Sequence, residues 1–123
     1  MPDGPIAGCS VLVVEDNYLL AGAMSRTLEA GGAEVVGPVP SVAAALRLLQ
    51  TRRPDAAVLD VNLGEETVFP VADVLAADGV PFLFVTAADE AMRPKRHGAA
   101  PWLSKPAEAS TTVRELRRLL DAA

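Results

Sequence analysis

AAVLD at residues 56–60 is an apolar run of strand length that ends in a carboxylate. A strand buried on both faces needs such continuous apolar character, and open parallel α/β sheets bind their ligands at the carboxyl ends of their strands. VLVVED at residues 11–16 repeats the pattern and ends in Glu15 and Asp16. If these two strands are neighbours in a parallel sheet, Glu15, Asp16 and Asp60 converge on one point.

Three carboxylates at one point repel one another unless a cation compensates their charge. At an effective dielectric constant near 20, two unit charges ~4 Å apart repel by about 4 kcal/mol. A protein that clusters carboxylates in this way is expected to bind a cation between them. The functional site is therefore expected at these three residues.

Length and composition describe one folded domain. Half of the 123 residues are hydrophobic and 22% are charged, which is typical of globular proteins. The net charge of −5 lacks the positive field that nonspecific nucleic-acid binding requires. Cys9 has no partner for an internal disulfide, and the sequence contains no apolar run of ~20 residues. We expect a cytoplasmic domain over residues 10–123 after a flexible arm over residues 1–9, with no direct nucleic-acid or membrane contact.

The remaining pattern alternates between strand-like and helix-like segments. We expect strands at 10–14, 34–36, 56–60, 80–85 and 102–103, and helices at 17–29, 41–49, 67–77 and 110–120. The segment 87–97 contains Pro94, which allows only a short or broken helix there. Alternating strands and helices form a parallel sheet with right-handed crossovers. The sequence therefore predicts an α/β fold with five strands and about five helices, the fourth short or irregular.

Four motifs lie at the expected carboxyl ends of four strands. They are VLVVED at 11–16, VLDVNLG at 58–64, FVTA at 84–87 and LSKP at 103–106. In this order and spacing they closely resemble the receiver domain of two-component response regulators, over nearly the whole chain. The resemblance implies a flavodoxin-like, doubly wound sheet with strand order 2-1-3-4-5. It also implies that Asp60 is phosphorylated by a histidine kinase or a histidine phosphotransfer protein.

The resemblance further implies a metal site in the acidic cluster. Phosphoryl transfer needs its transition-state oxygens neutralised, and Mg²⁺, which Mn²⁺ can replace, prefers oxygen ligands. Asp16 and Asp60 are the implied direct ligands, together with the backbone carbonyl of Asn62. Glu15, where the family more often has aspartate, is expected to act mainly through water.

Two further motif residues are implied to contact the phosphoryl group. Lys105 supplies a fixed positive charge to its oxygens, and Thr86 offers a hydroxyl that can move toward one of them. In such domains the peptide bond between this lysine and the following proline, here Pro106, is cis. That geometry would direct the lysine inward.

Three other positions are expected to affect switching and phosphoryl lifetime. Trp102 stands three residues before the motif lysine, where the family usually has a Tyr or Phe that changes rotamer; the alternative is a core tryptophan. Asn62 and Ala88 lie two residues after the phosphorylated aspartate and the switch threonine. At these positions, side chains can hold or exclude the water that hydrolyses the acyl phosphate.

The expected function is that of a stand-alone receiver that signals to an unknown downstream protein by contact, as a monomer or weak dimer. The reduced fourth helix resembles a subset of single-domain receivers from alphaproteobacteria. Such a protein is not a turnover enzyme, although it promotes its own phosphorylation and dephosphorylation. The alternatives are a phosphate sink, a degenerate receiver that acts only as a binding module, and a phosphatase of the haloacid dehalogenase type. The last class has a second aspartate where this chain has Asn62.

Overall fold

A computed structural model describes residues 4–122 of the chain. Its central sheet has five parallel strands in the order β2-β1-β3-β6-β7. The strands are β1 (Ser10–Val14), β2 (Glu34–Val39), β3 (Ala56–Leu59), β6 (Phe82–Thr86) and β7 (Trp102–Ser104). With β6 and β7 as the fourth and fifth strands of the sheet, this is the order 2-1-3-4-5. The predicted flavodoxin-like fold is confirmed.

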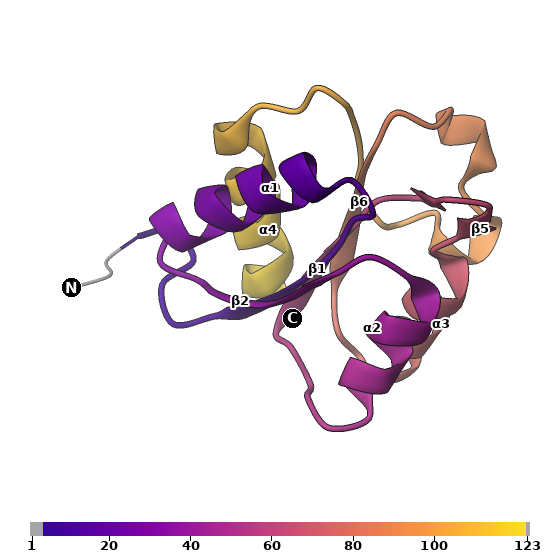
Figure 1. Ribbon diagram of the computed structural model, residues 1–123. Coiled ribbons are helices and arrows are strands. Elements are labelled where there is room, and N and C mark those ends of the chain that lie inside the picture. Colours follow the sequence, from indigo (N-terminus) through magenta and orange to yellow (C-terminus); the bar gives the residue numbers. More distant parts are fainter. Residues whose placement is uncertain (1–3, 123) are drawn as a thin grey trace.

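Four α-helices cover the two faces of the sheet. They are α1 (Tyr18–Ala30), α2 (Val42–Leu49), α3 (Phe69–Ala77) and α4 (Ala109–Ala122). Figure 1 shows α1 and α4 together on one face and α2 and α3 on the other. Successive residues of a strand point to opposite faces, so Leu12 packs in one apolar core while Val11 and Val13 pack in the other. None of the helices between residues 4 and 122 has the length and apolar character needed to cross a membrane.

Side chains cap the first turns of α1 and α2. The Asn17 side chain accepts a hydrogen bond from the backbone N–H of Leu20 at 3.0 Å and so caps α1. Ser41 caps α2 in the same way, by accepting from the Ala44 N–H at 3.1 Å. These caps fix where each helix leaves the loop that precedes it.

The connection between β3 and α3 differs from its prediction. The sequence predicts a loop at 61–64 and a helix from Thr67, whereas the structure has a two-stranded hairpin of β4 (Asn62–Leu63) and β5 (Glu66–Thr67). Gly64 makes the turn possible because its φ of 67° lies in the left-handed region that favours glycine. The expected loop is wrong, and the expected helix is present but starts at Phe69, because residues 66–67 pair with 62–63; Pro70 still lies in its first turn.

The first described residues pack against the domain. The sequence predicts a flexible arm over residues 1–9, of which residues 1–3 lie outside the described part. Ile6 is fully buried beside the end of α1, and its backbone N–H donates to the Gly31 carbonyl at 3.1 Å. Arg117 of α4 donates to the Pro5 carbonyl at 2.9 Å. The buried Ile6 side chain and these two hydrogen bonds thus hold the segment against the domain. The flexibility of the arm stays a prediction.

The segment between β6 and β7 contains two short 3₁₀ turns. The sequence predicts the fourth of about five helices in this segment, before the helix labelled α4 in Figure 1. The turns are η1 (Glu90–Met92) and η2 (Lys95–His97), with Pro94 between them in an extended conformation. The expected short, irregular fourth helix is confirmed. Asp73 of α3 anchors η2, because its carboxylate accepts hydrogen bonds from Arg96 at 2.8 and 3.2 Å and lies 2.7 Å from His97 Nε2.

Candidate functional site

Three carboxylates lie at the carboxyl ends of β1 and β3. The two strands pair in parallel with Val14 opposite Leu59, and the Asp60 N–H donates to the Val14 carbonyl at 2.9 Å. This register places Glu15 and Asp16 beside Asp60. One oxygen from each of the three carboxylates lies within 4.8 Å of the others. The structure therefore brings together the acidic residues that the sequence singled out.

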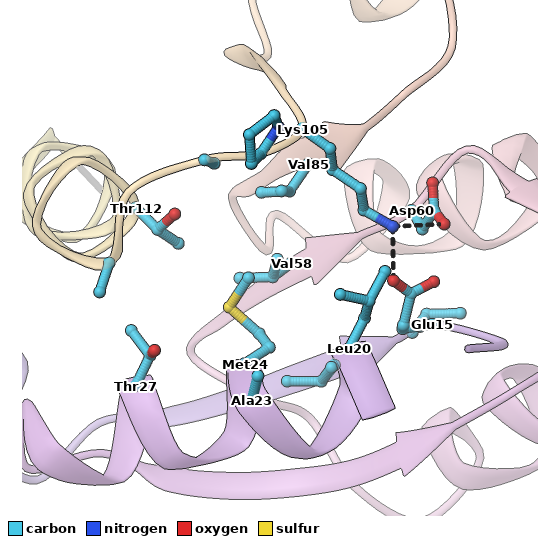
Figure 2. A pocket seen from close by; sticks show the side chains of 15 residues that line it. Glu15, Leu20, Ala23, Met24, Thr27, Val58, Asp60, Val85, Lys105 and Thr112 are labelled. Atoms are coloured by element: carbon cyan, nitrogen blue, oxygen red, sulfur yellow. Dashed lines mark hydrogen bonds and ion pairs between the residues drawn. The ribbon is translucent and has the colours of Figure 1, made fainter. Parts of the chain in front are cut away.

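Lys105 joins two of these carboxylates. Its Nζ donates to Glu15 Oε1 at 2.5 Å and to Asp60 Oδ2 at 3.0 Å, and Figure 2 shows the ammonium group between them. The Lys105 backbone N–H donates to the Thr86 carbonyl at 2.9 Å, which fixes the loop after β7 at this edge of the sheet. The bond between Lys105 and Pro106 is cis. The cluster thus holds one cationic and three acidic side chains.

Burial and hydrogen bonding separate the pKa values of the two acids that Lys105 bridges. Burial raises the pKa of Glu15 to about 7, reinforced by hydrogen bonding and charge from Asp60 and opposed by Lys105. Burial also acts to raise the pKa of Asp60, but hydrogen bonds involving Glu15, Thr86 and Lys105 outweigh it and lower that pKa below the ordinary value. Asp60 is therefore an ionised carboxylate at neutral pH, which is the form that can act as a nucleophile.

A threonine and a tryptophan from the neighbouring strands lie in one connected group. Thr86, at the end of β6, is only 1% exposed, and its hydroxyl oxygen accepts from the Ala88 N–H at 3.1 Å. The Ala88 carbonyl accepts from Trp102 Nε1 at 3.3 Å. The half-buried indole packs on Phe84, with the ring centroids 5.1 Å apart. Thr86 and Trp102 are thus linked through both backbone groups of Ala88.

Comparison with known proteins identifies the family. The sequence model of the family described as response regulator receiver domain matches residues 11–117 of this chain. The chain belongs to this family. Receiver domains act in two-component phosphorelay signalling, carry a phosphoryl group on an aspartate and bind Mg²⁺ in an acidic pocket. The identification agrees with the resemblance drawn from the four motifs.

Individual relatives and solved structures agree with the family match. A protein-glutamate methylesterase/protein-glutamine glutaminase of Halobacterium salinarum is 30% identical over 107 residues, which cover 82% of this chain and 31% of that protein. The chain thus spans about a third of this relative's length. SdrG from Sphingomonas melonis is 36% identical with a TM-score of 0.79, and the match covers 95% of this chain and 98% of that one. The receiver domain of a modulated diguanylate cyclase from Desulfovibrio desulfuricans is 31% identical with a TM-score of 0.82, over 93% and 94% of the two chains.

The acidic cluster of this receiver has donors that fit Mg²⁺. Glu15 Oε2 is buried and has no hydrogen-bond partner within residues 4–122, so a cation would satisfy it. Asp16 is exposed, and its Oδ2 accepts from the Gly64 N–H at 2.9 Å, which orients the carboxylate. Carboxylate oxygens are the hard ligands that Mg²⁺ prefers. Asn62 lies on β4 with its side chain exposed, two residues after Asp60.

A cavity beside the cluster was missed from the sequence. About 420 Å³ in volume, it lies between α1 and the segment leading into α4, and Glu15, Asp60 and Lys105 line part of it. Leu20 and Met24 line its α1 side, and Figure 2 shows how these side chains face the opening. The helical spacing of these apolar residues is visible in the sequence, but spacing alone does not distinguish a cavity wall from a packed core. The cavity is also lined by three small residues, Ala23, Ala107 and Ala109. Their small side chains were the one feature of the sequence that could have indicated unfilled space there.

Proposed function

We propose that Asp60 of this receiver accepts a phosphoryl group from a phosphohistidine on a histidine kinase or histidine phosphotransfer protein. The observation that supports this most is the ionised Asp60 carboxylate, 12% exposed, held by Lys105 beside two more acids. An Asp60 oxygen attacks phosphorus and the phosphorus–nitrogen bond breaks; its electron pair stays on the histidine ring, which carries a proton on its other nitrogen and so leaves as neutral imidazole. Lys105 would offset the negative charge of the transferring group, and Thr86 would donate a hydrogen bond from its hydroxyl to a phosphoryl oxygen.

The proposal includes a metal held by the acidic cluster. Asp16 and Asp60 would hold Mg²⁺ directly, with the Asn62 carbonyl as a further ligand and Glu15 acting mainly through water; Mn²⁺ can substitute. When bound, the ion supplies positive charge to the phosphoryl oxygens. The buried, unpaired Glu15 Oε2 and the Gly64 contact of Asp16 support this arrangement.

Replacing Asp16 by asparagine is expected to weaken Mg²⁺ binding about tenfold, because a charged ligand oxygen becomes a neutral one. The amide oxygen can still accept from the Gly64 N–H, so the loop should keep its position. Isothermal titration calorimetry with Mg²⁺ measures the effect, with Asp78→Asn as the matched change at an exposed site. Equal Mg²⁺ affinities in Asp16→Asn and the unmodified protein would exclude Asp16 as a ligand.

The lifetime of the acyl phosphate is proposed to depend on Asn62 and Ala88. Asn62 can hydrogen-bond an attacking water, whereas Ala88 offers neither a polar side chain nor much cover. Ala88→Glu is expected to change the rate of phosphoryl loss by at least about threefold, since a carboxylate there can position water. The rate is followed by intact-protein mass spectrometry after removal of the phosphodonor, with Ala76→Glu at an exposed position of α3 as control. A rate in Ala88→Glu equal to that of the unmodified protein would show that residue 88 does not control water access.

The N-terminal turn of α1 offers a docking surface for the histidine-bearing partner. Tyr18 and Leu19, which follow the acidic pair and Asn17, are 89% and 78% exposed, and the next residue, Leu20, lines the cavity. A partner must bring its imidazole to Asp60, so it has to contact this rim. The exposure of adjacent large apolar side chains supports a protein partner at this place.

One comparison of two assays separates the proposed function from its alternatives. A phosphorylated histidine kinase or phosphotransfer protein should transfer its label stoichiometrically to this chain, while turnover of p-nitrophenyl phosphate should be absent. Sustained turnover of the ester would favour a phosphatase of the haloacid dehalogenase type. Failure to accept any label would favour a degenerate receiver. If the protein accepts label but its binding to partner proteins does not change, a phosphate sink is favoured. We further propose that the phosphorylated receiver passes its state to another protein by direct contact.

A further inference from the structure

Arg93 caps the outer face of Trp102. Its guanidinium carbon lies 5.9 Å from the centre of the indole, within the range of a cation–π contact. The same guanidinium donates to the Ala100 carbonyl at 2.7 Å and to Glu90 Oε2 at 2.7 Å. Its side chain is only 21% exposed. Arg93 therefore ties together Glu90, the loop at Ala100 just before β7 and the indole on β7.

A set of contacts runs from the strand end beside the proposed phosphorylation site to this arginine. β3 and β6 pair in parallel with Leu59 opposite Phe84, so Thr86 lies at the end of the strand next to the one that carries Asp60. Thr86 and Trp102 are joined through the N–H and the carbonyl of Ala88, and Trp102 is covered by Arg93. Movement of the Thr86 hydroxyl toward a phosphoryl group would remove the acceptor of the Ala88 N–H. That change reaches the indole through the Ala88 carbonyl.

The other end of the segment is fixed. Asp73 of α3 holds both Arg96 and His97, and the buried His97 ring packs edge-on against Phe82 at 5.3 Å between centroids. Residues 95–97 are thus tied to α3 and to the sheet. Any rearrangement that follows Thr86 is therefore expected in the part of the segment before Pro94, which includes Arg93.

We propose that Arg93 is a positioning residue that holds Trp102 in the arrangement described here and so opposes the rearrangement of Thr86. This inference rests on the proposed phosphorylation of Asp60. For the indole to turn, it must leave the guanidinium and give up its bond to the Ala88 carbonyl. Because a ligand binds more tightly when the competing state is less stable, removing Arg93 should make a phosphoryl group at Asp60 easier to accommodate.

The experiment titrates beryllium trifluoride with Mg²⁺ into the unmodified protein, Arg93→Ala, Arg93→Lys and the control Lys95→Ala. Trp102 is the only tryptophan, so indole emission and its quenching by acrylamide report on this side chain alone. Arg93→Ala is expected to increase quenching before any addition and to lower the half-saturating beryllium trifluoride concentration about fivefold, because one cation–π contact and two hydrogen bonds are lost. Arg93→Lys, which keeps the cation, should fall between Arg93→Ala and the unmodified protein. Lys95→Ala changes a neighbouring exposed cation and should resemble the unmodified protein.

Separate readouts distinguish this inference from the proposed function. Labelling of Asp60 by acetyl phosphate tests the function, whereas acrylamide quenching without a phosphoryl mimic tests the contact of Arg93 with Trp102. Unchanged quenching and an unchanged titration in a folded, normally labelled Arg93→Ala would overturn the inference and leave the function intact. The inference also fails if Arg93→Lys increases quenching and lowers the half-saturating concentration as much as Arg93→Ala does, since the effect would then not depend on a cation over the indole. Absent labelling in the unmodified protein would instead contradict the proposed function.

Discussion

Asp60→Asn is expected to abolish labelling of the protein by acetyl phosphate and Mg²⁺. The substitution keeps the size of the side chain and leaves an amide oxygen that can accept from Lys105, whose Nζ now lies 3.0 Å from Asp60 Oδ2. It removes the charged oxygen that attacks phosphorus, and an amide cannot replace that nucleophile. Intact-protein mass spectrometry should show one added phosphoryl group on the unmodified protein and none on the variant.

The matched control for this variant is Asp78→Asn. Asp78 is an exposed residue after α3, so its replacement makes the same chemical change away from the acidic cluster. This control should be labelled as fully and as fast as the unmodified protein. Thermal unfolding followed by circular dichroism should show that both variants are folded. Stoichiometric labelling of a folded Asp60→Asn would place the phosphoryl group elsewhere.

Lys105→Met is expected to slow labelling about a hundredfold at saturating Mg²⁺, the typical cost of removing one fixed group that stabilises charge in a transition state. Methionine keeps much of the aliphatic stem and removes the ammonium group that joins Glu15 to Asp60. The labelling rate under excess acetyl phosphate measures the loss. The exposed Lys95, replaced in the same way, provides the control.

Removal of the same ammonium group should have the opposite effect on the metal. Lys105 competes with a bound cation for the oxygens of Glu15 and Asp60, so Mg²⁺ affinity measured by calorimetry should rise in Lys105→Met. Slower labelling together with tighter Mg²⁺ binding distinguishes loss of transition-state charge from general damage to the site. A labelling rate equal to that of Lys95→Met would show that Lys105 has no role in phosphoryl transfer.

The sheet and its acidic edge could be predicted because each depends on a local pattern. Continuous apolar runs such as the one ending at Asp60 are typical of strands buried on both faces, and they also determine where a side chain leaves the sheet. The parallel order then brings Glu15 and Asp16 to Asp60 without further information. Helix caps such as Asn17 are equally local, since the side chain bonds a backbone group three residues away.

The features that could not be predicted depend on contacts between distant segments. The hairpin that delays α3 requires residues 66–67 to pair with 62–63, which competes with a helical pattern that otherwise begins at Thr67. Ile6 stands among glycines and prolines, and only the position of the end of α1 shows that it is buried. The contact of Arg93 with Trp102 joins residues on different segments of an irregular region, where no periodicity indicates which side chains meet.

The most direct test of phosphorylation at Asp60 is chemical trapping of the acyl phosphate. Borohydride reduces an aspartyl phosphate to homoserine, and peptide mass spectrometry then reports the position of the modified residue. After reaction with a phosphorylated histidine kinase, the proposed function predicts homoserine at position 60 and at no other position. Trapping at Asp16, or a protein that remains unmodified while the kinase loses its phosphoryl group, would contradict it.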